Sequence, residues 1–182
     1  MRSINLASVL LGLQAASARI INTQFPHLIV PVKEESPNQV FGTQYSGEIS
    51  QEAGATSRVF TEILFDVPLN EATSCKVNFI VSEGAPREVT GSGAFAFDVW
   101  TVSGTPKDQD SWNNRPQLAQ WVLQVKLNPD GSVKSKTGGS VPCVKGLPNS
   151  FVVTPGNGTE GWKFTWLEID FPLQGIVFEM SA

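Results

Sequence analysis

The 182-residue sequence contains one histidine, two cysteines and no long apolar segment. Its lone histidine, His27, excludes metal sites built from several histidines, and any Ser-His-Asp triad would have to use it. A Gly-x-Ser-x-Gly motif and a phosphate-binding loop are also absent. We therefore predict that the protein is not an enzyme, that it holds no cofactor and no metal, and that His27 has a structural role beside a neighbouring turn.

Positive charge is scarce as well. The chain has 13 Lys and Arg against 17 Asp and Glu, which gives a net charge of −4. Without a basic block it lacks the electrostatic surface that binds nucleic acid or anionic membranes. No apolar run after residue 18 reaches the length of a membrane span, so we expect neither a nucleic-acid nor a membrane partner.

The first eighteen residues have the three parts of a secretory signal peptide. Arg2 supplies the positive charge of the first part. The second part is the apolar run from Ile4 to Leu13, which is too short to span a bilayer. The third part, Ala16-Ser17-Ala18, has the small residues that a signal peptidase recognises. We predict a signal peptide over residues 1–18, a single domain over 19–182, and a location outside the cell or in a cell wall.

Cys75 and Cys143 are the two cysteines. An even cysteine count in an exported chain favours a disulfide, and this bridge would close a loop of about 68 residues. In the chain-entropy model such a loop stabilises the fold by about 4 kcal/mol. The alternative is two separate buried thiols.

Asn157-Gly158-Thr159 is an N-glycosylation sequon within the turn-rich run from Pro155 to Gly161. Such a composition is typical of an exposed loop. We predict a glycan on Asn157, with an unoccupied sequon as the alternative.

Apolar residues recur with a period of two, which is typical of strands that bury one face. Alternating sets are Cys75, Val77, Phe79 and Val81; Ala119, Trp121, Leu123, Val125 and Leu127; and Trp162, Phe164 and Trp166. The segments 59–67 and 95–102 are apolar on both faces and predict central strands, whereas Pro31 limits 27–32 to an edge. With turns between these runs, the sequence predicts an all-β antiparallel β-sandwich or jelly roll of eight to ten strands.

The longest irregular stretch, residues 104–117, contains the most distinctive cluster of side chains, Trp112-Asn113-Asn114-Arg115. The ring, amides and guanidinium could stack on a sugar and bond its hydroxyls. The alternative is structural, with Trp112 capping the sandwich and Arg115 bonding loop carbonyls. Asp108 and Asp110 resemble the start of a calcium loop, but Trp112 stands where the third acid is expected.

Paired carboxylates are the remaining candidates for chemistry. Glu168 and Asp170 are alternate residues on a predicted strand, on the face of Trp162, Phe164 and Trp166, and two such acids could serve a glycosidase. The alternative places them in water where the strand leaves the core. Asp66 and Asp98 are each isolated in an apolar strand, where they are expected to bond turns or pair with arginine.

Several blocks of sequence resemble a known family. They are Phe25 to Pro31, Phe41 to Gly47, Phe65 to Pro68, Gly91 to Gly93 and Trp112 to Pro116. In this order they resemble the fungal family called ubiquitin 3 binding protein C-terminal domain, over about residues 25–182. The resemblance implies a β-sandwich, secreted or wall-associated proteins and no established catalytic residues. The family name comes from association with the activating enzyme of a ubiquitin-like modifier, which is intracellular and does not fit an export signal.

We therefore predict a secreted, non-enzymatic fungal glycoprotein of the cell wall, the matrix or a host-facing surface. Its role would be structural or would be to bind a wall polysaccharide or an extracellular protein. Two alternatives stay open: a glycan-active enzyme that uses Glu168 and Asp170, and a modulator of the activating enzyme of a ubiquitin-like modifier.

Overall fold

The computed structural model describes residues 18–182, so the predicted signal peptide lies almost wholly outside the described residues. Within this part of the chain there are thirteen strands and no helix. The strands are β1 (Ile20–Gln24), β2 (Leu28–Lys33), β3 (Ser46–Glu52), β4 (Thr56–Asp66), β5 (Ser74–Ile80), β6 (Arg87–Gly91), β7 (Ala96–Ser103), β8 (Gln117–Leu127), β9 (Val133–Gly138), β10 (Ser140–Val141), β11 (Pro148–Pro155), β12 (Trp162–Leu167) and β13 (Gly175–Ser181).

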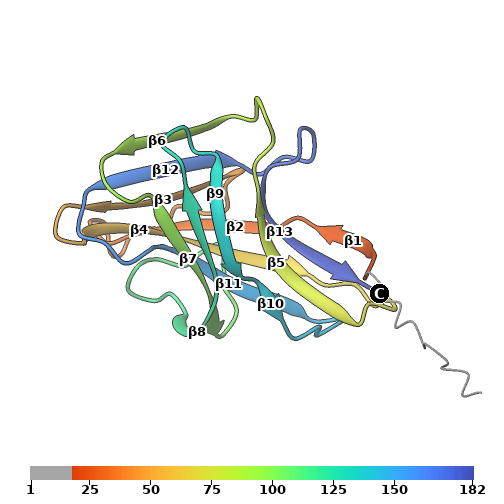
Figure 1. Cartoon of the computed structure of the whole chain (residues 1–182). Helices are drawn as coiled ribbons and strands as arrows, with labels where there is room; N and C mark the ends of the chain where they lie inside the picture. Colours follow the sequence, from red (N-terminus) through yellow and green to blue (C-terminus); the bar gives the residue numbers. More distant parts are fainter. Residues whose placement is uncertain (1–17) are drawn as a thin grey trace, which may run out of the picture.

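The strands form two antiparallel sheets (Figure 1). The smaller sheet has the order β1-β13-β5-β10, and the larger has the order β6-β12-β3-β4-β11-β7-β8-β9, with β2 paired to β4. This arrangement confirms the predicted all-β sandwich, and β2 is the edge strand that Pro31 requires. The strand count exceeds eight to ten because short strands such as β6, β9 and β10 bury too few side chains to show an apolar alternation.

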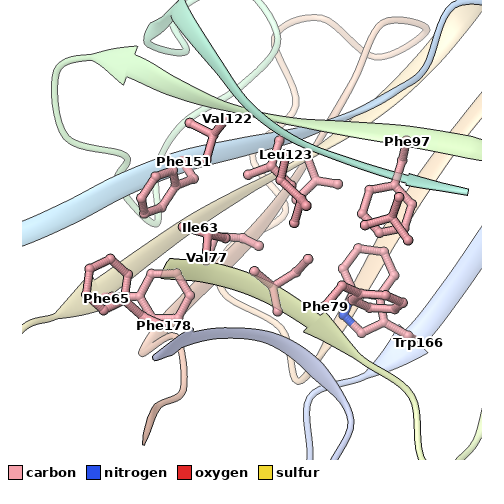
Figure 2. Close-up of a cluster of buried hydrophobic side chains, with 14 of the residues drawn as sticks. Ile63, Phe65, Val77, Phe79, Phe97, Val122, Leu123, Phe151, Trp166 and Phe178 are labelled. Atoms are coloured by element: carbon pink, nitrogen blue, oxygen red, sulfur yellow. The ribbon is translucent and has the colours of Figure 1, made fainter. Parts of the chain in front are cut away.

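Aromatic side chains from both sheets fill the space between them (Figure 2). Along β12, Trp162, Phe164 and Trp166 are 5%, 0% and 1% exposed, so the alternation predicted for this strand is confirmed. The Trp166 ring lies against the backbone of Gly47, where a Cβ atom would overlap it. Trp162 and Trp166 are therefore core residues.

The alternation predicted for β8 holds for only part of that strand. Leu123, Val125 and Leu127 are buried, but Ala119 is exposed and Trp121 is 39% exposed. The reason is a bulge, because Val99 of β7 pairs with Leu123 and the next residue, Trp100, pairs with Trp121. One extra residue reverses the faces of all residues beyond it. Val122 consequently joins Leu123 in the core (Figure 2).

The predicted disulfide is present. Cys75 in β5 is bonded to Cys143, which follows β10, with 5.0 Å between their Cα atoms. The bridge fixes the β10–β11 connection to the smaller sheet, so the alternative of two separate thiols is wrong.

The first and last strands lie side by side in the smaller sheet, where β1 (orange) runs along β13 (dark blue) in Figure 1. Arg19 and Ala182 exchange two backbone hydrogen bonds, of 3.0 and 3.1 Å. The two ends of the described chain are thus held together.

Candidate binding face on the large sheet

The nine-stranded sheet has one face toward the core and one face away from it, which we call the outer face. Ile63, Val99 and Val153 point into the core. Glu62, Trp100 and Val152 alternate with them, pair with one another across β4, β11 and β7, and therefore share the outer face. This face has a covered half and an open half.

The covered half lies beneath the connection 104–116. Here Val30, Val32, Phe60 and Val152 form a second apolar cluster, and Trp112 packs on it with its ring centroid 4.8 Å from that of Phe60. Sequence reasoning treated 104–117 as an irregular surface stretch, and the structure shows that Trp112 fastens it to the sheet.

The other predicted binding residues make contacts within the same connection and with its neighbour. The guanidinium of Arg115 lies 3.8 Å from the Trp112 ring centroid and donates a hydrogen bond to the Trp112 carbonyl. Asn113 donates to Asn38, at 2.8 Å, and Asn114 accepts from the backbone N–H of Ser111, at 2.6 Å. The four residues are brought together as expected. Their ability to bind a ligand stays a prediction.

An acid pair that the sequence analysis missed lies under this connection. Glu62 is 0% exposed, and within the described residues neither of its carboxylate oxygens has a hydrogen-bond partner. Burial raises its pKa to about 9, and the nearby carboxylate of Asp110 contributes in the same direction. Asp110 is itself buried and accepts from the Lys107 N–H at 2.8 Å, so it closes a turn of the connection. Glu62 is therefore protonated at neutral pH.

The open half carries two tryptophans and a carboxylate. Asp98 accepts from the indole N–H of Trp121 at 3.0 Å and from the Gln124 amide at 3.1 Å. The indole N–H of Trp100 bonds the Thr154 hydroxyl at 3.2 Å. Asp98 was expected to bond a turn or to pair with an arginine. It does neither, and instead orients the Trp121 ring on the outer face.

A hollow of about 340 Å³ lies on the outer face beside the covered half, and we call it the groove. Its main lining residues are Arg58, Phe60, Asp98, Trp100, Leu118 and Thr154, together with the loop 155–159. Trp112 does not line the groove but contacts two residues that do, since the Arg58 guanidinium lies 5.4 Å from its ring centroid and Phe60 packs against it. The tryptophan loop thus supports one wall of the groove.

The groove combines features suited to a carbohydrate. The partly exposed Trp100 ring can contact the C–H groups of a sugar ring, and the partly exposed Arg58 guanidinium can donate to its hydroxyls. Phe60, Asp98 and Thr154 are each 5% exposed and form the floor of the groove. The sequence did not single out Trp100, because it stands in a strand that is apolar on both faces. The carboxylate of Asp98, two residues earlier, was the one available signal that this strand has a polar side.

Glu168 and Asp170 do not share a strand as predicted, because β12 ends at Leu167 and both acids lie in the connection to β13. They do line one hollow of about 660 Å³, together with His27 and Tyr45. One oxygen of Glu168 accepts from the Trp166 indole N–H at 2.7 Å and from the Ile176 N–H at 2.9 Å. Burial nevertheless raises the Glu168 pKa to about 7, whereas Asp170 is exposed.

His27 occupies the rim of this second hollow. Its Nδ1 lies 3.0 Å from a carboxylate oxygen of Asp66, at the end of β4. Asp66 therefore contacts a histidine where a turn or an arginine was expected.

Residues 18–182 contain no group of three or more histidine, cysteine or acidic side chains placed to hold a metal ion. In the same part of the chain, no helix is long and apolar enough to cross a membrane.

Comparison with known proteins gives one match. A family model described as "Ubiquitin 3 binding protein But2 C-terminal domain" matches residues 24–169, which include every residue that lines the groove. No curated protein matches the chain. Because the family model covers most of the sequence, from before β2 to beyond β12, this chain belongs to the But2 C-terminal domain family.

Proposed function

We propose that the protein is an exported, non-enzymatic binding protein that holds a polysaccharide of a cell wall or matrix in the groove. The observation that carries this proposal is the groove on the outer face, where the partly exposed Trp100 lies beside Arg58 and the exposed Leu118. An aromatic residue that fills the core would lie between the sheets, as Trp162 and Trp166 do, whereas Trp100 lies on the outer face.

Binding by stacking requires rings that are held in place before the ligand arrives. Trp100 is bonded to Thr154 and Trp121 to Asp98, so each indole is restrained by its N–H group while part of the ring stays accessible. Arg58 is restrained by Glu34, which accepts from its guanidinium at 3.0 and 3.1 Å. The ion pair lowers the pKa of Glu34. This restraint lowers the entropic cost of binding.

Export is supported by the signal-peptide pattern of residues 1–18 and by the Cys75–Cys143 bridge, which suits an oxidising compartment. Cleavage after Ala18 would leave β1 and the Arg19 pairing with Ala182 in place. The mature chain would therefore keep every strand of the sandwich.

The experiment is co-sedimentation of the purified, secreted protein with insoluble wall polysaccharides, namely chitin, β-1,3-glucan and mannan. We expect Trp100→Ala to raise the dissociation constant by roughly two- to tenfold, since a stacked aromatic contact contributes about 0.5–1.5 kcal/mol beyond its buried area. Phe171→Ala is the matched control, because Phe171 is an exposed aromatic that does not line the groove.

Trp112→Ala separates the groove from the tryptophan loop as the binding site. If the loop itself binds, this variant loses binding while Trp100→Ala keeps most of it. If the groove binds, the loss is smaller and comes from a loosened Arg58 and Phe60 wall. Equal binding by wild type and Trp100→Ala on every polysaccharide tested would contradict the proposal.

A glycan-active enzyme is a second candidate, favoured by one observation: Glu168 and Asp170 line the same hollow, and the Glu168 pKa of about 7 suits a general acid. Release of reducing sugar that disappears in Glu168→Gln and Asp170→Asn would establish it. Against it stand the two N–H groups that tie one Glu168 oxygen to the fold, and the But2 family is not known as enzymatic.

The family description names a ubiquitin 3 binding protein, so a protein-binding role in a ubiquitin-like pathway, such as modulation of an activating enzyme, is the third candidate. The compartment decides between this candidate and export. Detection of the full-length chain in the cytosol, with none in the culture supernatant, would favour the ubiquitin-related role and contradict our proposal.

A further inference from the structure

The sequon Asn157-Gly158-Thr159 lies at the edge of the groove. Asn157 is exposed and lines two hollows at once, the groove and a neighbouring hollow of about 560 Å³ that contains Phe95 and Lys126. The first sugar attached to its side chain would therefore lie between the two hollows.

The loop that carries Asn157 is fastened on both sides. The Gly156 N–H donates to the Ala96 carbonyl at 2.7 Å, and the Gln51 side chain donates to the Gly158 carbonyl at 3.0 Å. The Gly54 N–H donates to the Thr159 carbonyl at 2.7 Å. These bonds join the loop to β7 and to the β3–β4 hairpin, so the position of Asn157 relative to the groove is fixed.

We propose that an N-linked glycan on Asn157 lies in the groove, over Trp100 and Arg58, and competes there with external polysaccharide. This inference rests on the proposed function, since it assigns a regulator to the same site. Attachment forms a bond from the Asn157 side-chain nitrogen, which loses a proton, to the anomeric carbon of a lipid-linked oligosaccharide. The lipid pyrophosphate leaves with the electrons of the broken C–O bond.

The chemistry of the groove favours the attached sugar for the same reasons that it favours a free one. N-acetylglucosamine presents an apolar ring face to Trp100 and hydroxyls to the Arg58 guanidinium. Because it is tethered at the rim, its effective concentration is in the millimolar range, which exceeds that of most soluble competitors. The neighbouring hollow is less suitable, since no tryptophan is among its lining residues.

The experiment compares three secreted forms of the full chain: wild type, Thr159→Ala, and wild type trimmed by an endoglycosidase to a single N-acetylglucosamine. Thr159→Ala abolishes attachment but keeps Asn157 and the backbone bond from Gly54. We expect Thr159→Ala to bind insoluble polysaccharide on the order of tenfold more tightly than wild type, with the trimmed form between them. Acrylamide quenching of the Trp100 fluorescence, obtained as the difference from Trp100→Phe, should increase in the same order.

A glycan attached at another position is the control for an effect of glycan size alone on binding. Glu71→Asn creates a sequon with Thr73 in the β4–β5 connection, and in the Thr159→Ala background this exposed position carries a glycan away from the groove. This double variant should bind as tightly as Thr159→Ala.

The outcomes separate the two proposals. Equal, saturable binding by all glycoforms overturns the inference and leaves the groove as a polysaccharide site. An unmodified Asn157 in the mass spectrum of the secreted protein also overturns it. If no form binds polysaccharide, the proposed function fails, and the inference fails with it unless removal of the glycan still increases quenching of Trp100.

Discussion

At the scale of single residues, Glu62 is the least expected feature of the molecule. It stands within the run from Val59 to Phe65, in which Thr61 is the only other polar residue, and the nearest basic residue in the sequence is Arg58, four positions before it. The fold places it under the 104–116 connection beside Asp110, where burial keeps it protonated. A protonated carboxyl needs no counter-charge, which is how the sheet accommodates an acid at that position.

Glu62 should make stability depend on pH. Its pKa is 4.5 in an unfolded chain and about 9 in the folded one, so its contribution is fully present below pH 4.5 and is lost as the pH rises toward 9. Each pH unit in this range costs about 1.4 kcal/mol. We expect the melting temperature of wild type to fall by roughly 5–10 °C between pH 7 and 9, and that of Glu62→Gln to fall much less.

Glu168 serves as the control for this measurement. Because its pKa is about 7, its contribution to stability also falls as the pH rises, but that fall ends near pH 7. Glu168→Gln should therefore flatten the curve below pH 7 and leave the decline above it. Parallel curves for wild type and Glu62→Gln from pH 7 to 9 would mean that Glu62 is ionised in the fold.

At the scale of elements, the contrast between β12 and β8 shows what the sequence can predict. Both alternate apolar and polar residues, and in β12 the alternation gives the buried face directly. In β8 the same reasoning places Trp121 in the core, but the bulge at Val122 turns it to the outer face. The bulge shows in the sequence as Val122, an apolar residue between Trp121 and Leu123 that interrupts the alternation. Since the pattern does not say which face Trp121 takes, the open half of the outer face could not be predicted.

Close packing between β3 and β12 should make Gly47 sensitive to substitution. A Cβ atom at Gly47 meets the Trp166 ring, which is held by its bond to Glu168. We expect Gly47→Ala to lower the free energy of unfolding by about 1–3 kcal/mol, measured by urea denaturation. Gly158→Ala, where a Cβ meets only the ends of the Glu160 and Gln51 side chains, is the control and should change stability little.

The disulfide acts between elements as well, because it joins β5 to the connection that precedes β11. Closing a loop with a sequence separation of 68 stabilises the fold by up to about 4 kcal/mol. We expect reduction, or a Cys75→Ala, Cys143→Ala double variant, to lower the melting temperature by roughly 5–15 °C. Unchanged melting under reductant would mean that the bridge has no structural role.

At the scale of the whole molecule, composition and alternation sufficed for the fold class, and five blocks of sequence sufficed for the family. The candidate site was harder to predict. Trp112 and Arg115 were selected because they stand in an irregular stretch, yet they brace the wall of a groove whose lining comes from strands. Residues on β4, β7 and β11 meet there only because non-consecutive strands pair, and a single sequence does not reveal that order.

Export is a property of the whole chain, and its test is direct. The chain expressed with its own first eighteen residues should appear in the culture supernatant, with Arg19 as the first residue found by N-terminal sequencing. Deletion of residues 2–18 should retain the protein in the cell. A secreted form that still begins at Met1 would contradict cleavage after Ala18.

Because β1 and β13 lie side by side, the strands of this sandwich could be synthesised in a different order and still form the same architecture. Since Arg19 and Ala182 are already bonded, a short linker between them would add little strain, and the chain could be opened instead at the turn from Asn128 to Gly131. Such a circular permutant keeps every strand neighbour and the disulfide. The new ends at the β8–β9 turn would then lie beside the neighbouring hollow, which Asn128 and Pro129 line, and a reporter could be attached there.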